Sequence, residues 1–578
     1  MKHTTQPCRN SAMPGTRRTL VAAAAVALPL LAAHHAYAQA PLTVDPGTAN
    51  RPGLAAAANG TPIVNITAPD SAGVSHNRFT DYNVNAAGLV LNNSATTSDT
   101  QLAGRIDGNP LLGGQSAAII LNQVTGANAS VLAGATEVAG QNARVIVANP
   151  NGISVNGGSF VNTSRVSLVA GTTEFDDNGN ITQFRTENGR LVIDGAGLDA
   201  RNVDQLDLVS RSLKVNAALQ ARRLVAVAQQ GTAQIEQSGS HQFVGETIGP
   251  LPDVAIDVSR LGSMHASAIT MYGTSAGVGV NVAGKIDALT GGITMSSGGV
   301  VRVQDSGHVA GHNVSIGGRL DNAGAMTGGT LVAQQAVANS GTVDVGSASL
   351  MGATTNTGRI RADESLAAMG NVINDGEMRG GKSVTVTGSL RNGGDGRIAS
   401  GGTITAMSGV SNGGSMHADR NMVIMGALRN EKGGRVSSYG KITRMGGVLN
   451  SGDVIEYMTR PASGEAASAV TSQPVTPTVP PIVADKPAQP EIIPPVASKP
   501  ATPIAKPIPP MMVFPPMMSG LAPVYIPPIS FAPVRPTFVP PPGYMLPRPA
   551  AYSPFGVTWM PPVFGQPIVF NPAFASRA

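Results

Sequence analysis

The side chains best suited to metal binding or catalysis are few in this sequence and widely spaced. His308 and His312 stand four residues apart, a spacing that can hold a metal ion on a helix. The short apolar runs between glycines favour strands instead, and four residues along a strand separate two side chains by about 13 Å. We therefore expect these histidines to share no metal ion, and we expect no metal site.

The charged residues also predict no catalytic centre. Arg359, Arg361, Asp363 and Glu364 form a mixed group that we interpret as turn and outward-facing positions. We expect no nucleophile elbow, no phosphate-binding loop and no zinc site of the His-Glu-x-x-His type. The chain is accordingly predicted not to be an enzyme and to need no cofactor.

The acidic stretch Asp176–Asn180 (DDNGN) has two interpretations. Asn and Gly tolerate the left-handed backbone of a tight turn, which predicts a hairpin between Glu174-Phe175 and Ile181–Phe184. A calcium loop is the alternative, but the twelve-residue spacing with a closing Glu is absent. The sequence favours the hairpin.

The elements of the fold are best indicated by the stretch Glu137–Gly171. Two apolar runs, Ala143–Ala148 and Val166–Ala170, flank a turn-rich centre that contains Asn149-Pro150-Asn151-Gly152. Pro fixes φ, and Asn and Gly tolerate positive φ. We expect a strand to end at Asn149 and the next to begin at Ile153, as in a chain wound into coils.

This stretch resembles the secretion domain of the filamentous haemagglutinin family, the exoproteins of bacterial two-partner secretion. The resemblance rests on ANPNGI (Ala148–Ile153), on GGSFVNTSR (Gly157–Arg165) and on the upstream run Gln101–Gly126. It covers about 59–175 closely and the following repeats, to about 457, more loosely. It implies that the secretion motif consists of Asn149, Pro150, Asn151, Gly152 and Ile153, together with Asn109 and Pro110.

Two features depart from the family pattern. The upstream motif, usually Asn-Pro-Asn-Leu, is Asn109-Pro110-Leu111-Leu112 here. The cysteine pair that many members carry after the second motif is replaced by Ser and Gly around Ser154–Ser159, so no disulfide is expected there.

The N-terminus has the form of an export signal. An apolar run of 14 residues, Leu20–Ala33, precedes the small-x-small site Ala36-Tyr37-Ala38. The run is shorter than the roughly 20 residues that span a membrane. We predict a signal peptide over residues 1–38, cleaved after Ala38. The basic residues before it are Lys2, Arg9, Arg17 and Arg18.

The single cysteine, Cys8, lies in this predicted signal peptide, so the mature chain would have none. Two explanations stay open. A long repetitive core needs no disulfides, and a chain that threads a narrow pore must not be cross-linked beforehand.

The composition also limits the partners. Charged residues make up 13% of the chain, about half the usual share. The formal net charge of +5 is spread over 578 residues, with no basic cluster interleaved with aromatics. We therefore expect no nucleic-acid partner.

An internal repeat is visible from about 318 to 452, with an asparagine recurring every 17 to 20 residues. Around each asparagine, three short apolar segments are separated by glycines, which predicts one coil of a right-handed parallel β-helix. Stacked coils place equivalent side chains about 4.8 Å apart, so we expect these amides to form an internal structural ladder; exposed ligand-binding asparagines are the alternative. The ladder asparagines are Asn322, Asn339, Asn356, Asn374, Asn392, Asn412, Asn430 and Asn450.

The predicted fold is therefore all-β. It divides into a signal peptide (1–38), an entry or cap segment (39–59), a secretion domain (60–240), β-helix repeats (241–460) and a tail (461–578). The tail holds 31 of the 43 prolines, and we expect it to be mostly disordered. Coils of about 20 residues over about 400 residues would make a rod about 95 Å long.

The resemblance implies a function. The chain is expected to pass through the periplasm of a Gram-negative bacterium and to cross the outer membrane through a partner barrel transporter. It would then act outside the cell or on its surface as an adhesin or interaction protein, contacting a host-cell or bacterial receptor or a glycan. Two alternatives stay open: a carrier of a contact-dependent inhibition toxin, in shortened form, and a β-helix enzyme acting on polysaccharides.

Overall fold

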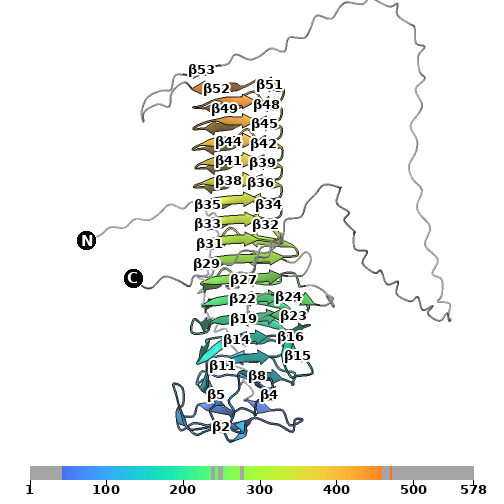
Figure 1. Ribbon diagram of the computed structural model, residues 1–578, viewed down its shortest axis with the longest axis vertical. Helices are drawn as coiled ribbons and strands as arrows, with labels where there is room; N and C mark the ends of the chain where they lie inside the picture. The colour runs from blue at the N-terminus through green and yellow to red at the C-terminus, as the bar shows by residue number, and fades with distance from the viewer. Residues whose placement is uncertain (1–41, 236–240, 245–251, 274–278, 458–468, 472–578) are drawn as a thin grey trace, which may run out of the picture. The chain divides into compact units, whose positions relative to one another are not determined.

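The computed structural model describes residues 42–235, 241–244, 252–273, 279–457 and 469–471. These residues form strands that stack as a parallel β-solenoid, one coil above the next, which confirms the predicted all-β class (Figure 1). Among them the single helical element is a 3-10 turn, η1 (Pro110–Leu112), and no helix is long and apolar enough to cross a membrane. The predicted signal peptide lies outside the described residues, as does the predicted tail apart from 469–471.

The solenoid has three faces, and most coils contribute strand residues to each of them. The first face is a sheet of fifteen parallel strands. Its strands are β9 (Ser130–Leu132), β12 (Ile153–Val155), β17 (Arg190–Ile193), β20 (Ser212–Val215), β25 (Ile256–Val258), β28 (Val280–Val282), β30 (Val300–Val303), β32 (Arg319–Asn322), β34 (Val337–Asn339), β36 (Thr354–Asn356), β39 (Val372–Asn374), β42 (Leu390–Asn392), β45 (Val410–Asn412), β48 (Leu428–Asn430) and β51 (Val448–Asn450).

The second face begins with β3 (Pro62–Asn65), β5 (Leu89–Asn93) and β10 (Ala135–Gly140). It continues with β13 (Gly158–Val161), β18 (Leu198–Ala200), β21 (Ala218–Ala221), β26 (Ser263–Ala266), β37 (Arg359–Ala362), β40 (Glu377–Gly380), β43 (Arg397–Ser400), β46 (Ser415–Ala418), β49 (Arg435–Ser438) and β52 (Asp453–Tyr457).

The third face consists of β4 (Val74–Asp81), β8 (Ile119–Val124), β11 (Ala143–Ala148), β14 (Thr163–Val169), β19 (Gln205–Ser210), β22 (Arg223–Ala228), β27 (Ala268–Gly273), β38 (Ser365–Ala368), β41 (Ser383–Val386), β44 (Thr403–Ala406), β47 (Met422–Ile424) and β50 (Ile442–Arg444). Four long strands run through both the second and the third face: β29 (Lys285–Ser297), β31 (His308–Ile316), β33 (Ala325–Ala333) and β35 (Thr342–Leu350).

Along each short strand, buried side chains alternate with side chains that face outward, and the buried ones stabilise the coil. In β42, Leu390 and Asn392 are buried whereas Arg391 is exposed, and β48 repeats this pattern. Successive side chains of a strand point to opposite faces, so one residue in two enters the solenoid. The inward residues of all coils form one continuous apolar core from Val64 to Val454.

The N-terminal end of the solenoid is covered by antiparallel strands. β1 (Thr43–Val44) pairs with β4, and β2 (Gly53–Ala56) pairs with β3. A second hairpin, β6 (Ser98–Thr100) and β7 (Gly104–Ile106), lies between β5 and η1 along the chain. The segment expected as an entry or cap thus contains the strands that pair with the edge of the first coil.

Asp176–Asn180 forms the predicted hairpin turn. β15 (Thr172–Phe175) pairs antiparallel with β16 (Ile181–Thr186), and Asp176 N donates to Asn180 O at 3.0 Å. The pair extends through β23 (Gly231–Ile235) and β24 (His241–Val244) into a four-stranded antiparallel sheet, a feature that the sequence did not predict.

The solenoid is shorter than the length estimated from the sequence. Among the described residues the second face stacks the most strands, seventeen from β3 to β52, and their sixteen steps of about 4.8 Å make about 77 Å. The estimate of 95 Å was wrong because the coils before residue 318 are longer than 20 residues. From Ile153 to its partner Leu191, for example, the chain also builds β15 and β16.

Coil stacking also continues across the boundary expected at residue 240, since β22 pairs with β27 and β20 with β25. At the other end, β53 (Ala469–Thr471) pairs antiparallel with β52, so these residues of the expected tail are a strand. They precede the densest prolines, and their N–H groups are able to pair with a strand edge.

Candidate functional site

Asn149 joins two successive coils at the corner between β11 and β12. Its side chain is fully buried, and Nδ2 donates to Asn128 O and to Ser130 Oγ, both at 2.9 Å. Its Oδ1 accepts from Asn151 N at 2.9 Å and from Asn151 Nδ2 at 3.1 Å. The strand ends at Ala148, one residue before the predicted end at Asn149, and the next strand begins at Ile153, as predicted.

The rest of the motif completes a tight turn. Gly152 N donates to Asn149 O at 3.1 Å, and Gly152 has a φ of 116°, which favours glycine. A Cβ at Gly152 would lie 2.8 Å from Arg190 O in the next coil. Ile153 enters the core, whereas Pro150 is partly exposed and Asn151 is exposed.

Asn109 plays a similar role at the N-terminal end. It is buried, and its Nδ2 donates to Ile66 O at 2.8 Å and to Asn92 O at 2.9 Å. Its Oδ1 accepts from Leu111 N at 2.9 Å, which caps η1, while Pro110 at the first position of η1 is exposed. Asn109 and Asn149 therefore lie at separate corners and form no common pocket: both satisfy backbone groups inside the solenoid.

The eight ladder asparagines occupy the last position of successive first-face strands and are paired in register. Asn322 Nδ2 donates to Asn339 Oδ1 at 2.7 Å, and the same bond repeats at 2.7 to 2.8 Å up to Asn450. Each interior amide also donates to the carbonyl of the turn that follows it, as Asn374 Nδ2 does to Gly376 O at 3.0 Å. The ladder lies inside the solenoid, so exposed ligand-binding amides were the wrong alternative for these residues.

Other buried amides near the N-terminal end were missed from the sequence. Asn77 Oδ1 accepts from Thr67 N at 2.9 Å, and Asn93 Oδ1 accepts from Ala117 N at 2.7 Å. Asn93 Nδ2 donates to Ala117 O and Gln141 O, both at 2.9 Å. The available signal was an asparagine inside an apolar strand, as in LVLNN of Leu89–Asn93, because such an amide needs partners once it is buried.

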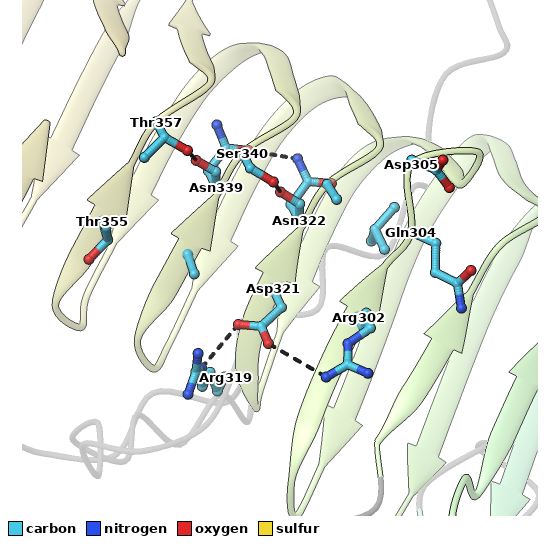
Figure 2. A pocket seen from close by; sticks show the side chains of 13 residues that line it. Arg302, Gln304, Asp305, Arg319, Asp321, Asn322, Asn339, Ser340, Thr355 and Thr357 are labelled. Atoms are coloured by element: carbon cyan, nitrogen blue, oxygen red, sulfur yellow. Dashed lines mark hydrogen bonds and ion pairs between the residues drawn. The ribbon is translucent and has the colours of Figure 1, made fainter. Parts of the chain in front are cut away.

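A shallow hollow of about 510 Å³ lies beside the ladder on the first face. Figure 2 shows Asp321 between Arg319, at 3.0 Å, and Arg302, at 3.9 Å. Ser340 Oγ and Thr357 Oγ1 donate to the carbonyls of Asn322 and Asn339, both at 3.4 Å (Figure 2). With Asp305 at its rim, the hollow holds two arginines and two aspartates and has no net charge.

The residues considered for chemistry do not converge. His308 and His312 lie on one strand, β31, and the described residues contain no group of three or more His, Cys, Asp or Glu able to hold a metal ion. Arg361 and Asp363 form an exposed ion pair at 3.2 Å, and Arg359 pairs with Asp344 at 2.7 Å.

Two short strings match enzymatic motifs despite the expectation that none would occur. Gly376–Ser383 fits the phosphate-loop pattern, but it runs from β40 into β41 with no helix, so it lacks the helix N-terminus that binds phosphate. Gly273–Gly277 fits the Gly-x-Ser-x-Gly pattern, and residues 274–277 lie outside the described residues.

Comparisons with known proteins agree with the position of the motif. Residues 40–303 match the family model of the TPS secretion domain, a wider range than the 60–240 expected from the sequence. The chain is 41% identical over 292 residues to a "tRNA nuclease CdiA" of Escherichia coli (strain NC101), which covers 47% of this chain and 9% of that protein. It is 40% identical over 263 residues to "tRNA nuclease CdiA-2" of Burkholderia pseudomallei (strain 1026b), which covers 45% of this chain and 8% of that protein.

Among solved structures, the filamentous hemagglutinin secretion domain aligns with 53% of this chain and 99% of that chain, at 29% identity and a TM-score of 0.43. The chain spans a tenth or less of the length of the curated relatives it matches. The secretion domain implies a cognate outer-membrane transporter, and proteins of this family are exported across the outer membrane to the cell surface or the extracellular space. Residues 40–303 are therefore a TPS secretion domain, and this domain is the part of the chain that resembles the CdiA proteins.

Proposed function

We propose that this exoprotein passes through the periplasm of a Gram-negative cell, leaves through its partner barrel and acts at a surface as an adhesin-type interaction protein. The observation that supports this function most directly is the solenoid that continues beyond the secretion domain. Coils stack without interruption from β30, at the end of the family match, to β52. A stack of coils displays outward side chains at regular spacing and at a distance from its first coil.

One set of outward side chains suits such contacts. Five methionines, 44 to 67% exposed, follow the third-face strands of successive coils, interrupted once by Thr387. Their backbone N–H groups each donate to the coil before, as Met425 N does to Ala406 O at 2.9 Å, so they form one column. Methionine is a flexible apolar side chain that is common at binding surfaces. The column consists of Met351, Met369, Met407, Met425 and Met445.

The secretion motif acts, in this proposal, by building the corners of the first coils. Asn149 and Asn109 are buried and bond to backbone, so they are not available for direct contact with a transporter. Pro150, Asn151 and Pro110 keep exposed surface. The transporter would therefore contact the exposed turn residues, while the buried amides hold those residues in place.

The first experiment is to express the gene in a Gram-negative host with and without a matching barrel transporter. An immunoblot of medium, cell surface and periplasm follows the chain. Appearance outside the cell only with the barrel is the expected result. Retention in the periplasm with a cognate barrel would contradict the export proposal.

Adhesion needs its own test, because the receptor is a separate question. Secreted protein carrying Met407→Ser and Met425→Ser is compared with wild type for binding to host and bacterial cells. The matched control changes Thr385→Ser and Thr405→Ser, on the same face. Binding lost in the methionine variant alone supports the proposal, whereas no saturable binding of the wild type to any cell would count against it.

A second function, carriage of a contact-dependent toxin, is favoured by the names of the relatives, which are called nucleases and toxins. The matched part is the secretion domain, so those activities are not carried over to this chain. Growth of sensitive neighbouring cells in co-culture distinguishes the two functions, since a toxin carrier inhibits them and an adhesin does not. We further propose that the chain has no enzymatic activity, including cleavage of polysaccharides, which incubation of the secreted protein with a polysaccharide panel would test.

A further inference from the structure

Four arginines meet where the third-face strands β11, β14, β19 and β22 begin. Arg144 lies beside Arg165 across an irregularity in the pairing of β11 with β14. Arg165 is opposite Gln205 in β19, and the pairing of β19 with β22 places Arg223 next to Gln205. Arg222 precedes Arg223. These side chains line a cavity of about 860 Å³, which we call the arginine cavity.

Residues other than the four arginines form the walls of the arginine cavity. Asn180, at the end of the turn between β15 and β16, lines one side together with Ala72. Ser267 and Ala268, at the start of β27, line the cavity next to Arg223, which pairs with Ala268.

The charges around the cavity do not balance. Asp204 pairs with Arg222 at 2.7 Å. Asp207 is fully buried. Its carboxylate accepts hydrogen bonds from Arg165 Nε, Ser167 Oγ and Gln205 Nε2, each at 2.7 Å. Four guanidinium groups thus face two carboxylates, which leaves an excess of two positive charges.

Burial makes this excess costly. The side chains of Arg144 and Arg165 are only 17% and 10% exposed. Arg144 NH2 donates to Ser167 Oγ at 2.9 Å, but its Nε is buried without a hydrogen-bond partner among the described residues. Burial first, and then the neighbouring Arg165, lowers the pKa of Arg144 to about 10. An anion in the cavity would offset the excess of positive charge and would accept hydrogen bonds from the guanidinium groups.

The hollow of Figure 2 provides the contrast within the same solenoid. It also holds two arginines, Arg302 and Arg319, but Asp321 lies between them and Asp305 stands at the rim, so its charges cancel. Arg223, by comparison, contacts the neutral amide of Gln205 at 3.5 Å. The presence of arginines is therefore not sufficient to define the site. What distinguishes the arginine cavity is that its guanidinium groups are partly buried and outnumber the carboxylates.

We propose that the arginine cavity binds a phosphate oxyanion carried on a larger molecule. Guanidinium groups match the geometry of phosphate oxygens and donate two parallel hydrogen bonds to them. Sites for whole small molecules range from about 300 to 1,000 Å³, so the cavity has room for more than a lone phosphate. Two sources share this chemistry: the phosphorylated head group of a glycolipid in the outer membrane that the protein crosses, and a soluble phosphate ester.

The test uses the full secreted protein and pyrophosphate as the probe in isothermal titration calorimetry. Arg223→Gln removes an exposed guanidinium, and we expect it to weaken binding about tenfold, as for one charge-assisted contact. Arg302→Gln, the same change in the neutral hollow, is expected to leave binding unchanged. Arg144→Gln is expected to weaken binding by at least as much, and circular dichroism checks that each variant is folded.

Vesicles of neutral phospholipid, with or without a phosphorylated glycolipid, then separate the two sources. Flotation with the glycolipid vesicles that Arg223→Gln abolishes identifies a membrane head group. Binding of pyrophosphate without flotation identifies a soluble ester. The proposal is overturned if neither probe binds saturably at millimolar concentration, or if Arg302→Gln weakens binding as much as Arg223→Gln does.

Discussion

Buried amides are the residues on which this structure depends most clearly. Asn149 alone satisfies a carbonyl, a hydroxyl and the backbone N–H of Asn151 at one corner. A buried polar group that loses its partner costs about 1 to 3 kcal/mol. The consequence of a single substitution therefore depends on how many groups it leaves unpaired.

Replacing Asn149 with Ala is expected to reduce export strongly. The variant leaves Asn128 O and Ser130 Oγ without this donor and releases Asn151, so the exposed turn loses its fixed position. Immunoblots of medium and cells in the barrel-expressing host measure the effect. Asn178→Ala, in the exposed hairpin turn, is the matched control. If Asn149→Ala and Asn151→Ala are both exported normally, the role assigned to the motif fails.

In the asparagine ladder, position decides the size of the effect. Asn374 accepts from Asn356 and donates to Asn392, Gly376 and Arg397, so Asn374→Ala is expected to destabilise its neighbouring coils by about 1 to 3 kcal/mol. Asn450 is partly exposed at the end of the ladder, and Asn450→Ala should cost less. Hydrogen exchange of the amides in β36, β39 and β42 measures the first effect, and exchange in β48 and β51 measures the second. Equal effects at the two positions would argue against the ladder as a source of stability.

At the scale of elements, the strands were predicted well wherever a turn motif or a regular repeat spacing marked where they begin and end. The turn Asn149–Gly152, the hairpin at Asp176–Asn180 and the repeat from 318 onward rest on local turn chemistry and on equal spacing, both visible in one sequence. The partners of a strand are not local. Asn93 bonds to Ala117 and Gln141, and Arg165 to Asp207, across coils of unequal length, so their positions could not be inferred from spacing.

The same limit explains the missed sheet. β23 and β24 join β15 and β16 although 44 residues separate Thr186 from Gly231 in numbering, with two further coils between them. Short apolar runs predict strands equally well inside a coil and in an excursion from it. The length of each excursion set the error in the estimated rod length.

The hairpin turn should respond to acid. Hydrogen bonds from the side chain and then the backbone of Asn180 lower the pKa of Asp176 below its usual 3.8. A lowered carboxyl pKa means that the turn is stabilised above about pH 3.8 and loses this support as the pH falls through the folded-state pKa. Amide exchange at Asn178 and Asn180, followed from pH 5 to pH 2, is expected to accelerate at the acidic end. Asp176→Asn should remove this acid response, and a variant that keeps it would refute the assignment to Asp176.

For the described solenoid as a whole, stability is a sum over neighbouring coils, because each coil contacts mainly the coils before and after it. The register supports this additivity. Asn356, Asn374 and Asn392 are equivalent positions at intervals of 18 residues, and the strands around them pair without a shift. Whole coils should therefore be removable, whereas fractions of a coil should not.

Deleting residues 374–391, one full coil, is expected to leave a folded solenoid shortened by about 4.8 Å. The deletion joins Ile373 to Asn392, which restores the Val-Ile-Asn end of β39. Deleting only 374–382 shifts the inward side chains of every following strand and should abolish folding of the later coils. Circular dichroism and resistance to protease compare the two deletions. A full-coil deletion that unfolds the protein would contradict independent coils.

The ladder also has an electrical direction. Every amide from Asn322 to Asn430 donates from Nδ2 to the Oδ1 of the next coil, so the side-chain dipoles point the same way, and each bond polarises its neighbours. At its start, Asn322 Oδ1 is buried and has no hydrogen-bond partner among the described residues. A single reversed amide would bring two N–H groups together on one side and two oxygens on the other. The orientation of one asparagine is thus imposed on all eight, and a coil joining the stack can do so only with its amide oxygen facing the coil already formed.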